Sequence, residues 1–251
     1  MLETCVNQGA GLQRIALQAA PRVIAMASHG NQQGELPLLW SLCSTLADSG
    51  YPVVVLDANT AESCDNPGLE QLLQDAHWRH EEPNEPTSCS VIPALIGLQT
   101  MVASQSTNGL RLERLSGLLQ NFGVILIYAR ADLLVSLLPG SDIEPLLTVS
   151  PVKMSAVTAY QALKKMFLDA GLRPTVANIV IEPLSKTVEP NQSPVNKLQE
   201  CAMAFLGYRL DALTIRARSS EGRATDDVRR LALRLLENAM PLHRHHFVGS
   251  H

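Results

Sequence analysis

The sequence contains no uninterrupted apolar run of the roughly 18 residues that a membrane-spanning helix requires. Its first residues, MLETCVNQGAG, have neither the basic nor the apolar section of a secretory leader, so we expect a cytoplasmic protein. Cysteines are few and scattered, at Cys5, Cys43, Cys64, Cys89 and Cys201, without a C-x-x-C pair. This odd number predicts neither a disulfide framework nor a zinc site, and it fits a reducing compartment.

Motifs of the common enzyme classes are absent as well. The sequence has no G-x-S-x-G elbow, no H-E-x-x-H, and no G-x-G-x-x-G that opens a helix after a strand, so we assign no catalytic residue. His29 lies in a loop without a placed partner, and we interpret it as solvent-facing. His243, His245 and His246 have no carboxylate or cysteine beside them, so no metal site is predicted in the tail.

Positive charge is not in excess. The formal net charge is −4 at pH 7, and we therefore predict no direct nucleic-acid partner. Arginines gather only near the C-terminal end, where we interpret them as a solvated helix face in preference to a nucleic-acid or lipid patch. These residues are Arg216, Arg218, Arg223, Arg229, Arg230 and Arg234.

Apolar runs and amphipathic helical stretches alternate along the chain. The predicted strands are residues 22–28, 52–57, 123–129, 145–150, 174–181 and 208–215, and the predicted helices are 35–49, 110–121, 155–170, 194–206 and 224–239. This alternation indicates an α/β fold, a doubly wound parallel sheet with helices on both faces. We predict a domain at 21–240, an N-terminal arm at 1–20, a frayed tail at 241–251 and a mobile connection at 77–90.

The most informative segment is HGNQQGELP, residues 29–37, between the first predicted strand and the first predicted helix. A working phosphate-binding loop offers backbone N–H groups and a lysine to the phosphates, and a Ser or Thr hydroxyl to Mg²⁺. This loop keeps Gly34 but continues with Glu35 and Leu36. We therefore expect the architecture of such a loop without its reactive side chains.

This loop, together with VVLDAN and FGVILIYAR further on, resembles the MinD/ParA class of deviant P-loop ATPases over nearly the whole chain. The resemblance implies the P-loop NTPase fold of that class. Gly30 replaces its signature lysine, Glu35 the P-loop lysine, Leu36 the magnesium-binding hydroxyl, and Tyr128 a metal-holding or water-organising aspartate. The remaining polar or flexible positions of the degenerate nucleotide site are Gly30, Gly34, Asp57, Asn59 and Asn178, the last matching an asparagine at the nucleotide base.

Exchanging lysine for glutamate turns an attraction for phosphate into a repulsion. A pair of unit charges at about 4 Å is worth on the order of 1 kcal/mol in water and about 4 kcal/mol near a protein surface. Because the metal ligands are missing too, we expect no ATP or Mg²⁺ cofactor and no ATPase activity. The alternative is a slow or unorthodox ATPase that uses Asp57, Asn59 and Asn178.

Two segments are similar to the flagellar-number regulators of this class, the FlhG/FleN type. Residues 91–102, VIPALIGLQTMV, are similar to the segment after the family's third strand, and residues 7–15, NQGAGLQRI, to its D-Q-A-x-x-L-R motif. In that family the motif forms a short helix that stimulates an SRP-type GTPase, FlhF. The resemblance implies this partner, with an ordinary polar arm as the alternative. The implied contact residues are Asn7, Gln8, Leu12, Gln13 and Arg14.

Several properties of that family stay open. Relatives bind a flagellar transcription activator, dimerise around ATP and act at the cell pole, so such a partner, a homodimer and polar recruitment are options. Residues 225–240 have an apolar stripe that fits a peripheral lipid-binding helix. We favour the alternative, in which they form the last helix that covers the sheet. The same fold would also serve another polar machine, such as cellulose secretion, pilus assembly or DNA partition.

Overall fold

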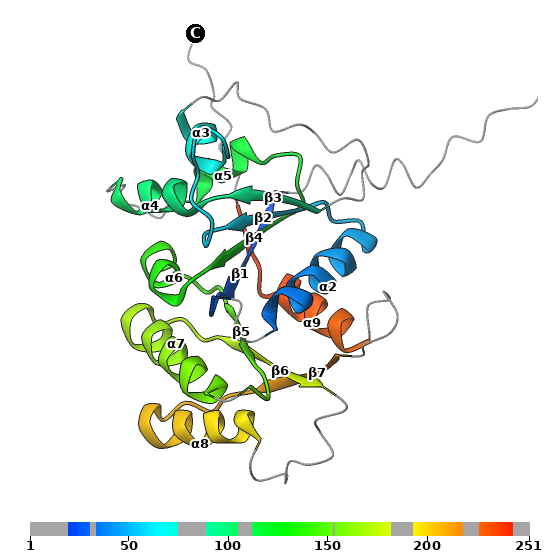
Figure 1. The fold of residues 1–251 in the computed structure, drawn as a ribbon, viewed down its shortest axis with the longest axis vertical. Coiled ribbons are helices and arrows are strands. Elements are labelled where there is room, and N and C mark those ends of the chain that lie inside the picture. Colours follow the sequence, from blue (N-terminus) through cyan, green and yellow to red (C-terminus); the bar gives the residue numbers. More distant parts are fainter. Residues whose placement is uncertain are drawn as a thin grey trace, which may run out of the picture.

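The computed structural model describes residues 20–30, 34–74, 89–104, 112–152, 154–181, 193–217 and 226–242. Within them, seven parallel strands form one sheet in the order β3-β2-β4-β1-β5-β6-β7, and a short eighth strand pairs antiparallel with β1 (Figure 1). The strands are β1 (Arg22–Ala27), β2 (Val53–Asp57), β3 (Cys89–Pro93), β4 (Val124–Ala129), β5 (Leu146–Val149), β6 (Thr175–Ile181), β7 (Ala212–Ala217) and β8 (Met240–Pro241). The predicted α/β fold with a parallel sheet is confirmed.

Helices cover both faces of this sheet. One face packs against α2 (Glu35–Asp48) and α9 (Asp226–Glu237), which Figure 1 shows side by side. The other helices pack on the opposite face. They are α3 (Leu69–Gln74), α4 (Leu95–Ala103), α5 (Glu113–Leu118), α6 (Ala131–Leu137), α7 (Ser155–Ala170) and α8 (Pro194–Leu206).

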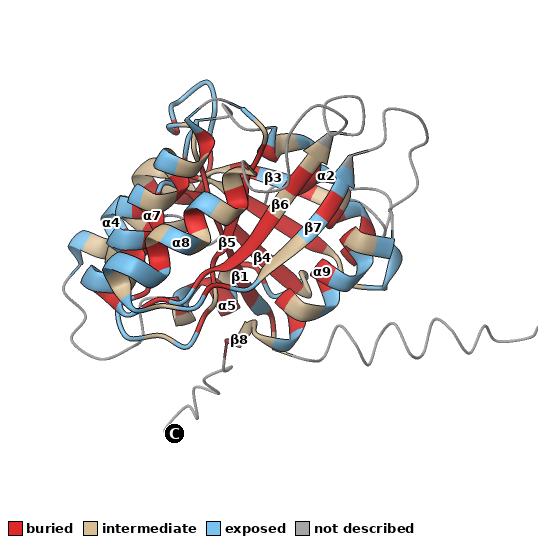
Figure 2. Ribbon diagram, turned by 90° about the horizontal axis from the view of Figure 1, so that it is seen from below, coloured by how far each residue is buried: buried red, intermediate tan, exposed pale blue. Residues whose placement is uncertain are grey.

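Burial on both faces explains why the strands are continuously apolar. In β2, Val54 and Leu56 pack into the cluster below α3 to α8, whereas Val53 and Val55 pack into the cluster below α2 and α9. Successive strand residues point to opposite faces, so both faces need apolar side chains. Figure 2 shows most strands as the buried centre of the molecule, whereas β7 at the edge has exposed residues.

Several elements differ from the sequence prediction. Strand β3, helices α3, α4 and α6, and the short β8 were not predicted, and β3 begins inside the segment 77–90 that was predicted as a connection. Helix α4, LIGLQTMVA, contains no charged residue, so it gives no amphipathic signal. The strand predicted at 208–215 begins only at Ala212, because residues 208–211 lead from the end of α8 at Gly207 into the sheet.

A buried carboxylate fixes where α4 begins. Glu62, 5% exposed, accepts hydrogen bonds from the backbone N–H groups of Ile96 (2.7 Å) and Gly97 (2.8 Å). A Cβ atom at Gly97 would lie 2.8 Å from Leu69 of α3, so the two helices approach closely at this glycine. The chain after β2 is thereby held against the helix that follows β3.

The folded part extends slightly beyond the predicted boundary at residue 240. Pro241 pairs with Arg22 in β1, and the Leu242 N–H donates to the Pro21 carbonyl at 2.8 Å. Leu242 is 1% exposed and belongs to the core. The rest of the predicted tail, and the predicted N-terminal arm as far as residue 19, lie outside the described residues.

The last helix covers the sheet, as we favoured. Five apolar residues of α9 are buried: Val228, Leu231, Ala232, Leu235 and Leu236. This stripe is therefore part of the core and does not face a lipid surface. No helix among the described residues is both long enough and apolar enough to cross a membrane.

Leu235→Ala distinguishes a covering helix from a lipid-binding one. Leu235 is 2% exposed, so its truncation should lower the free energy of unfolding by about 2–5 kcal/mol, measured by urea denaturation. The matched control is Leu233→Ala on the same helix, 54% exposed, which should change stability by no more than about 0.5 kcal/mol. Equal, small effects of both substitutions would contradict the packing of α9.

Candidate functional site: the loop between β1 and α2

The loop that follows the central strand β1 lies where the carboxyl ends of the parallel strands meet, the usual ligand edge of such a sheet. The Ser28 N–H continues the pairing by donating to the Ala129 carbonyl at 2.8 Å. Gly30 (φ 71°) and Gly34 (φ 68°) both adopt the left-handed conformation that glycine tolerates best. Gly34 occupies the N-cap position of α2, and Glu35 is the first helical residue.

The Glu35 side chain turns inward and is fully buried, at 0% exposure. Its Oε1 atom accepts hydrogen bonds from the His29 backbone N–H at 2.8 Å and from the Tyr128 hydroxyl at 2.9 Å. A hydrogen bond to a charged group contributes about 1.5–3 kcal/mol. The first turn of α2 also favours a negative charge, because the helix dipole is positive there. The carboxylate therefore acts as an internal anion of this loop.

Tyr128 reaches Glu35 from β4, where it lies between Met26 of β1 and Asp57 of β2. It is 4% exposed, and this burial raises the pKa of its phenol well above the ordinary value. A hydrogen bond with Ser28 opposes the rise in this pKa, while the negative charges of Glu35 and Asp57 add to it. The phenol therefore stays protonated at neutral pH and donates to the carboxylate.

His29 does not face solvent as predicted. Its side chain is only partly exposed, and its ring atom Nε2 is buried. Burial lowers the pKa of the imidazole, although the charge of Glu35 acts in the opposite direction. His29 is thus neutral at pH 7, and it contributes to the site through its backbone N–H.

A second hydrogen-bonded group ties this loop to the end of β2. Asp57 Oδ1 accepts from the backbone N–H (2.9 Å) and side-chain amide (3.0 Å) of Asn59, and Oδ2 accepts from the Thr60 hydroxyl (2.7 Å). The Ser28 hydroxyl donates to Asn59 Oδ1 at 2.8 Å. The Gly30 N–H in turn donates to the Ser28 hydroxyl oxygen at 3.2 Å.

Most residues predicted for the degenerate nucleotide site do lie together in these two groups. They are Gly30, Gly34, Glu35, Asp57, Asn59 and Tyr128. Leu36 packs instead against the core under α2 and α9. Asn178 lies on β6, paired with Val149 and Thr214, and does not join either group in the described structure. The predicted contact residues Asn7, Gln8, Leu12, Gln13 and Arg14 lie outside the described residues.

The sequence analysis did not predict the hydroxyl groups of Ser28 and Thr60 in this site, nor the contact between Glu35 and Tyr128. Ser28 and Thr60 were not predicted, although Ser28 directly follows β1 and Thr60 lies three residues after the end of β2, at the edge where site residues collect. The contact between Glu35 and Tyr128 joins residues 93 apart in the sequence. From the sequence, both positions were interpreted as departures from the pattern of the MinD/ParA class, and in the structure they are in direct contact.

A hollow of about 800 Å³ adjoins the loop at Gly30 and Asn59 and extends between α4 and α6. Arg130 lies on its rim, exposed, and its nearest recorded charge partner is Asp132 at 3.6 Å. No group of three His, Cys, Asp or Glu that could hold a metal occurs within the described ranges.

The comparisons with known proteins concern the fold. No protein-family model and no curated protein matches the chain. Among solved structures, cobyrinic acid a,c-diamide synthase from Mycobacterium smegmatis with bound ADP and magnesium is similar at 16% identity, over 86% of this chain and 94% of that chain, with a TM-score of 0.56. The MinD cell division protein of Aquifex aeolicus is similar at 15% identity, over 88% and 99%, with a TM-score of 0.54.

The Aquifex aeolicus MinC:MinD complex gives a third match, at 16% identity over 89% of this chain and 99% of that chain, with a TM-score of 0.53. All three matches cover most of both chains at low identity. They support the predicted MinD/ParA-type P-loop fold.

Tyr128→Phe tests the contact with Glu35. The variant should unfold about 1–3 kcal/mol more readily at pH 7, because the buried carboxylate loses a donor. In the wild type, the raised pKa of Tyr128 stabilises the fold fully below the ordinary tyrosine pKa of about 10, and this stabilisation is lost progressively as the pH rises from that value toward the higher pKa of the folded state. The stability difference between the two proteins should therefore narrow in alkaline buffer, measured by urea denaturation. Tyr160→Phe is the control, and a gap independent of pH would contradict the assignment.

Proposed function

We propose that this protein is a pseudo-ATPase, a MinD/ParA-like regulator that acts by binding partner proteins and not by nucleotide turnover. The observation that carries this proposal is the buried Glu35 carboxylate on the backbone N–H of His29 and the hydroxyl of Tyr128. In a phosphate-binding loop, backbone N–H groups are directed at the phosphates. Here the chain supplies the anion itself.

Binding of a triphosphate would disturb this arrangement at two points. The ligand would have to displace the Glu35 carboxylate from its two donors, which together contribute several kcal/mol. It would also approach the carboxylate of Asp57, at about 1–4 kcal/mol of repulsion for each charge pair at about 4 Å. The Tyr128 phenol offers Mg²⁺ no carboxylate in compensation. The slow-ATPase alternative therefore has less physical support.

Calorimetric titration with MgATP tests the pseudo-ATPase proposal. We expect no saturable heat for the wild type at millimolar nucleotide. Glu35→Gln removes the charge while keeping the size of the side chain, so it should gain at most weak phosphate affinity, since the metal ligands remain missing. Tight binding to the wild type, lost on changing residues 28–35, would favour the slow ATPase instead.

The second part of the proposal is the partner. We propose that residues 7–15 form a short helix that binds an SRP-type GTPase of the FlhF kind and thereby regulates flagellar number or placement. In a helix, Gln8 and Leu12 share one face, which offers an apolar anchor and an amide that can orient a water molecule. The arm leads into β1, the strand between β4 and β5, and the Pro21 carbonyl just before β1 accepts from Leu242. A rigid core thus anchors the arm.

Stimulation of GTP hydrolysis by a purified flagellar SRP-type GTPase tests this partner. The full chain should stimulate the GTPase, and the chain lacking residues 1–20 should not. Leu12→Ala and Gln8→Ala should each reduce stimulation by about tenfold or more, the scale of a lost anchor or a lost water-orienting group. Gln18→Ala, in the same arm but outside the motif, is the control. If the full chain does not stimulate the GTPase, the proposed partner is wrong, and a role in another polar machine becomes the better explanation.

A further inference from the structure

Strand β7 forms one edge of the sheet. It pairs with β6 in parallel register, from Val176 opposite Ala212 to Val180 opposite Arg216. On its other side no strand is recorded in the described part of the chain. An unpaired strand edge presents a row of backbone N–H and C=O groups, which are able to pair with an additional strand.

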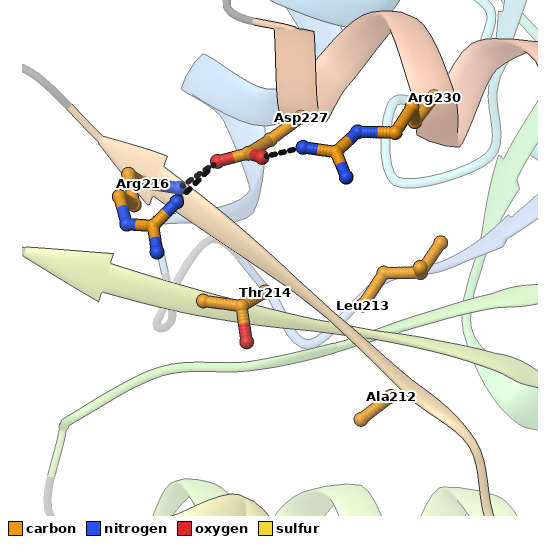
Figure 3. A pocket seen from close by; sticks show the side chains of 6 residues that line it. All are labelled: Ala212, Leu213, Thr214, Arg216, Asp227 and Arg230. Carbon is orange, nitrogen blue, oxygen red and sulfur yellow. Dashed lines mark hydrogen bonds and ion pairs between the residues drawn. The ribbon is translucent and has the colours of Figure 1, made fainter.

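A hollow of about 340 Å³ lies along this edge, and Figure 3 shows the side chains around it. Its walls are formed by Ala212, Leu213, Thr214 and Arg216 of β7 and by Asp227 and Arg230 of α9. Neighbouring residues of a strand point to opposite faces of the sheet. Because this hollow is lined by consecutive β7 residues that point to opposite faces, it lies at the edge of the sheet and not on one face.

The backbone of β7 indicates which residues face this hollow. The Arg216 N–H donates to Asp227 Oδ2 of α9 at 3.4 Å, so it is directed away from β6. The N–H and C=O groups of a strand residue point to the same side of the strand, and this side alternates from one residue to the next. Thr214 and Ala212 therefore also present their backbone groups to the free edge.

The charges at the hollow are unequal. Asp227 lies 2.8 Å from Arg230 and 3.5 Å from Arg216, so one carboxylate serves two guanidinium groups (Figure 3). The Asp227 side chain is 11% exposed, whereas those of Arg216 and Arg230 are 61% and 71% exposed. One positive charge is thus in excess and accessible to solvent. An acidic side chain beside the edge would find guanidinium donors, and a basic one would be repelled.

We propose that β7 binds an extended, acidic peptide segment of a partner protein, which adds to the sheet as a further strand. Hydrogen bonds to the backbone of Ala212 and Thr214 hold the peptide, and the guanidinium groups of Arg216 and Arg230 select Asp or Glu in it. β7 is separated from β1 by β5 and β6. The proposal is therefore independent of the nucleotide site and of the N-terminal arm.

A random twelve-residue peptide library displayed on phage tests this proposal, with selection on the full chain and counter-selection on Thr214→Pro. Proline at this position removes the N–H that faces the hollow and leaves the pairing with β6 in place. We expect enriched peptides to combine β-branched residues with Asp or Glu. On binding, such a peptide should slow amide hydrogen exchange in residues 212–217.

Point variants measure the selectivity of the edge by fluorescence anisotropy with one enriched, labelled peptide. Arg216→Gln and Arg230→Gln should each weaken peptide binding about three- to tenfold. These two variants test the proposal even if Thr214→Pro does not fold. Arg229→Gln, an exposed neighbour on α9, is the matched control and should bind as the wild type. Enrichment of no acidic peptide, binding insensitive to both arginine substitutions, or dimerisation through β7 in place of peptide binding would overturn the proposal.

Discussion

A buried carboxylate that accepts two hydrogen bonds from the chain's own groups determines the character of this site. Glu35 connects three elements: it begins α2, it accepts the N–H of His29 after β1, and it accepts the hydroxyl of Tyr128 on β4. An ionised carboxylate without such donors would be costly at 0% exposure. The loop conformation, the protonated phenol and the burial of the carboxylate therefore support one another.

Two glycines of the described part of the loop adopt a conformation that favours glycine. Gly30 and Gly34 both have positive φ, which glycine adopts without strain. The polar groups that remain near the strand ends bond to each other, with Ser28, Asn59 and Asp57 joined in one chain of hydrogen bonds. In our proposal this MinD/ParA-type fold is a scaffold, and its function depends on the N-terminal arm and on the free edge of β7.

The fold class and most long elements were predictable, because continuous apolar strands and amphipathic helices such as α7 leave clear patterns. α7 also ends as expected at Gly171, which adopts the left-handed conformation. Short elements without periodicity, such as α4, were not predictable. Glu35 and Tyr128 were singled out from the sequence, but their contact was not predicted, because it depends on the placement of β4 beside β1.

The same limit applies to two cysteines that looked scattered. Cys43 of α2 and Cys89 of β3 influence each other: the interaction with Cys89, together with burial, raises the pKa of the Cys43 thiol, while the interaction with Cys43 lowers the pKa of Cys89. Their separation by 46 positions gives no local signal. Only the docking of α2 on the sheet brings them together. Contacts between residues far apart in the sequence can be predicted only once the order of the strands and the packing of helices on both faces of the sheet are known.

The most direct measurement of the central claim is a crystal structure of the protein grown with Mg²⁺ and a non-hydrolysable triphosphate. Our account predicts the Glu35 carboxylate within hydrogen-bond distance of the His29 N–H and the Tyr128 hydroxyl, with no nucleotide in the loop. Ordered triphosphate density on the loop N–H groups, with the Glu35 side chain rotated out of its buried position, would contradict it.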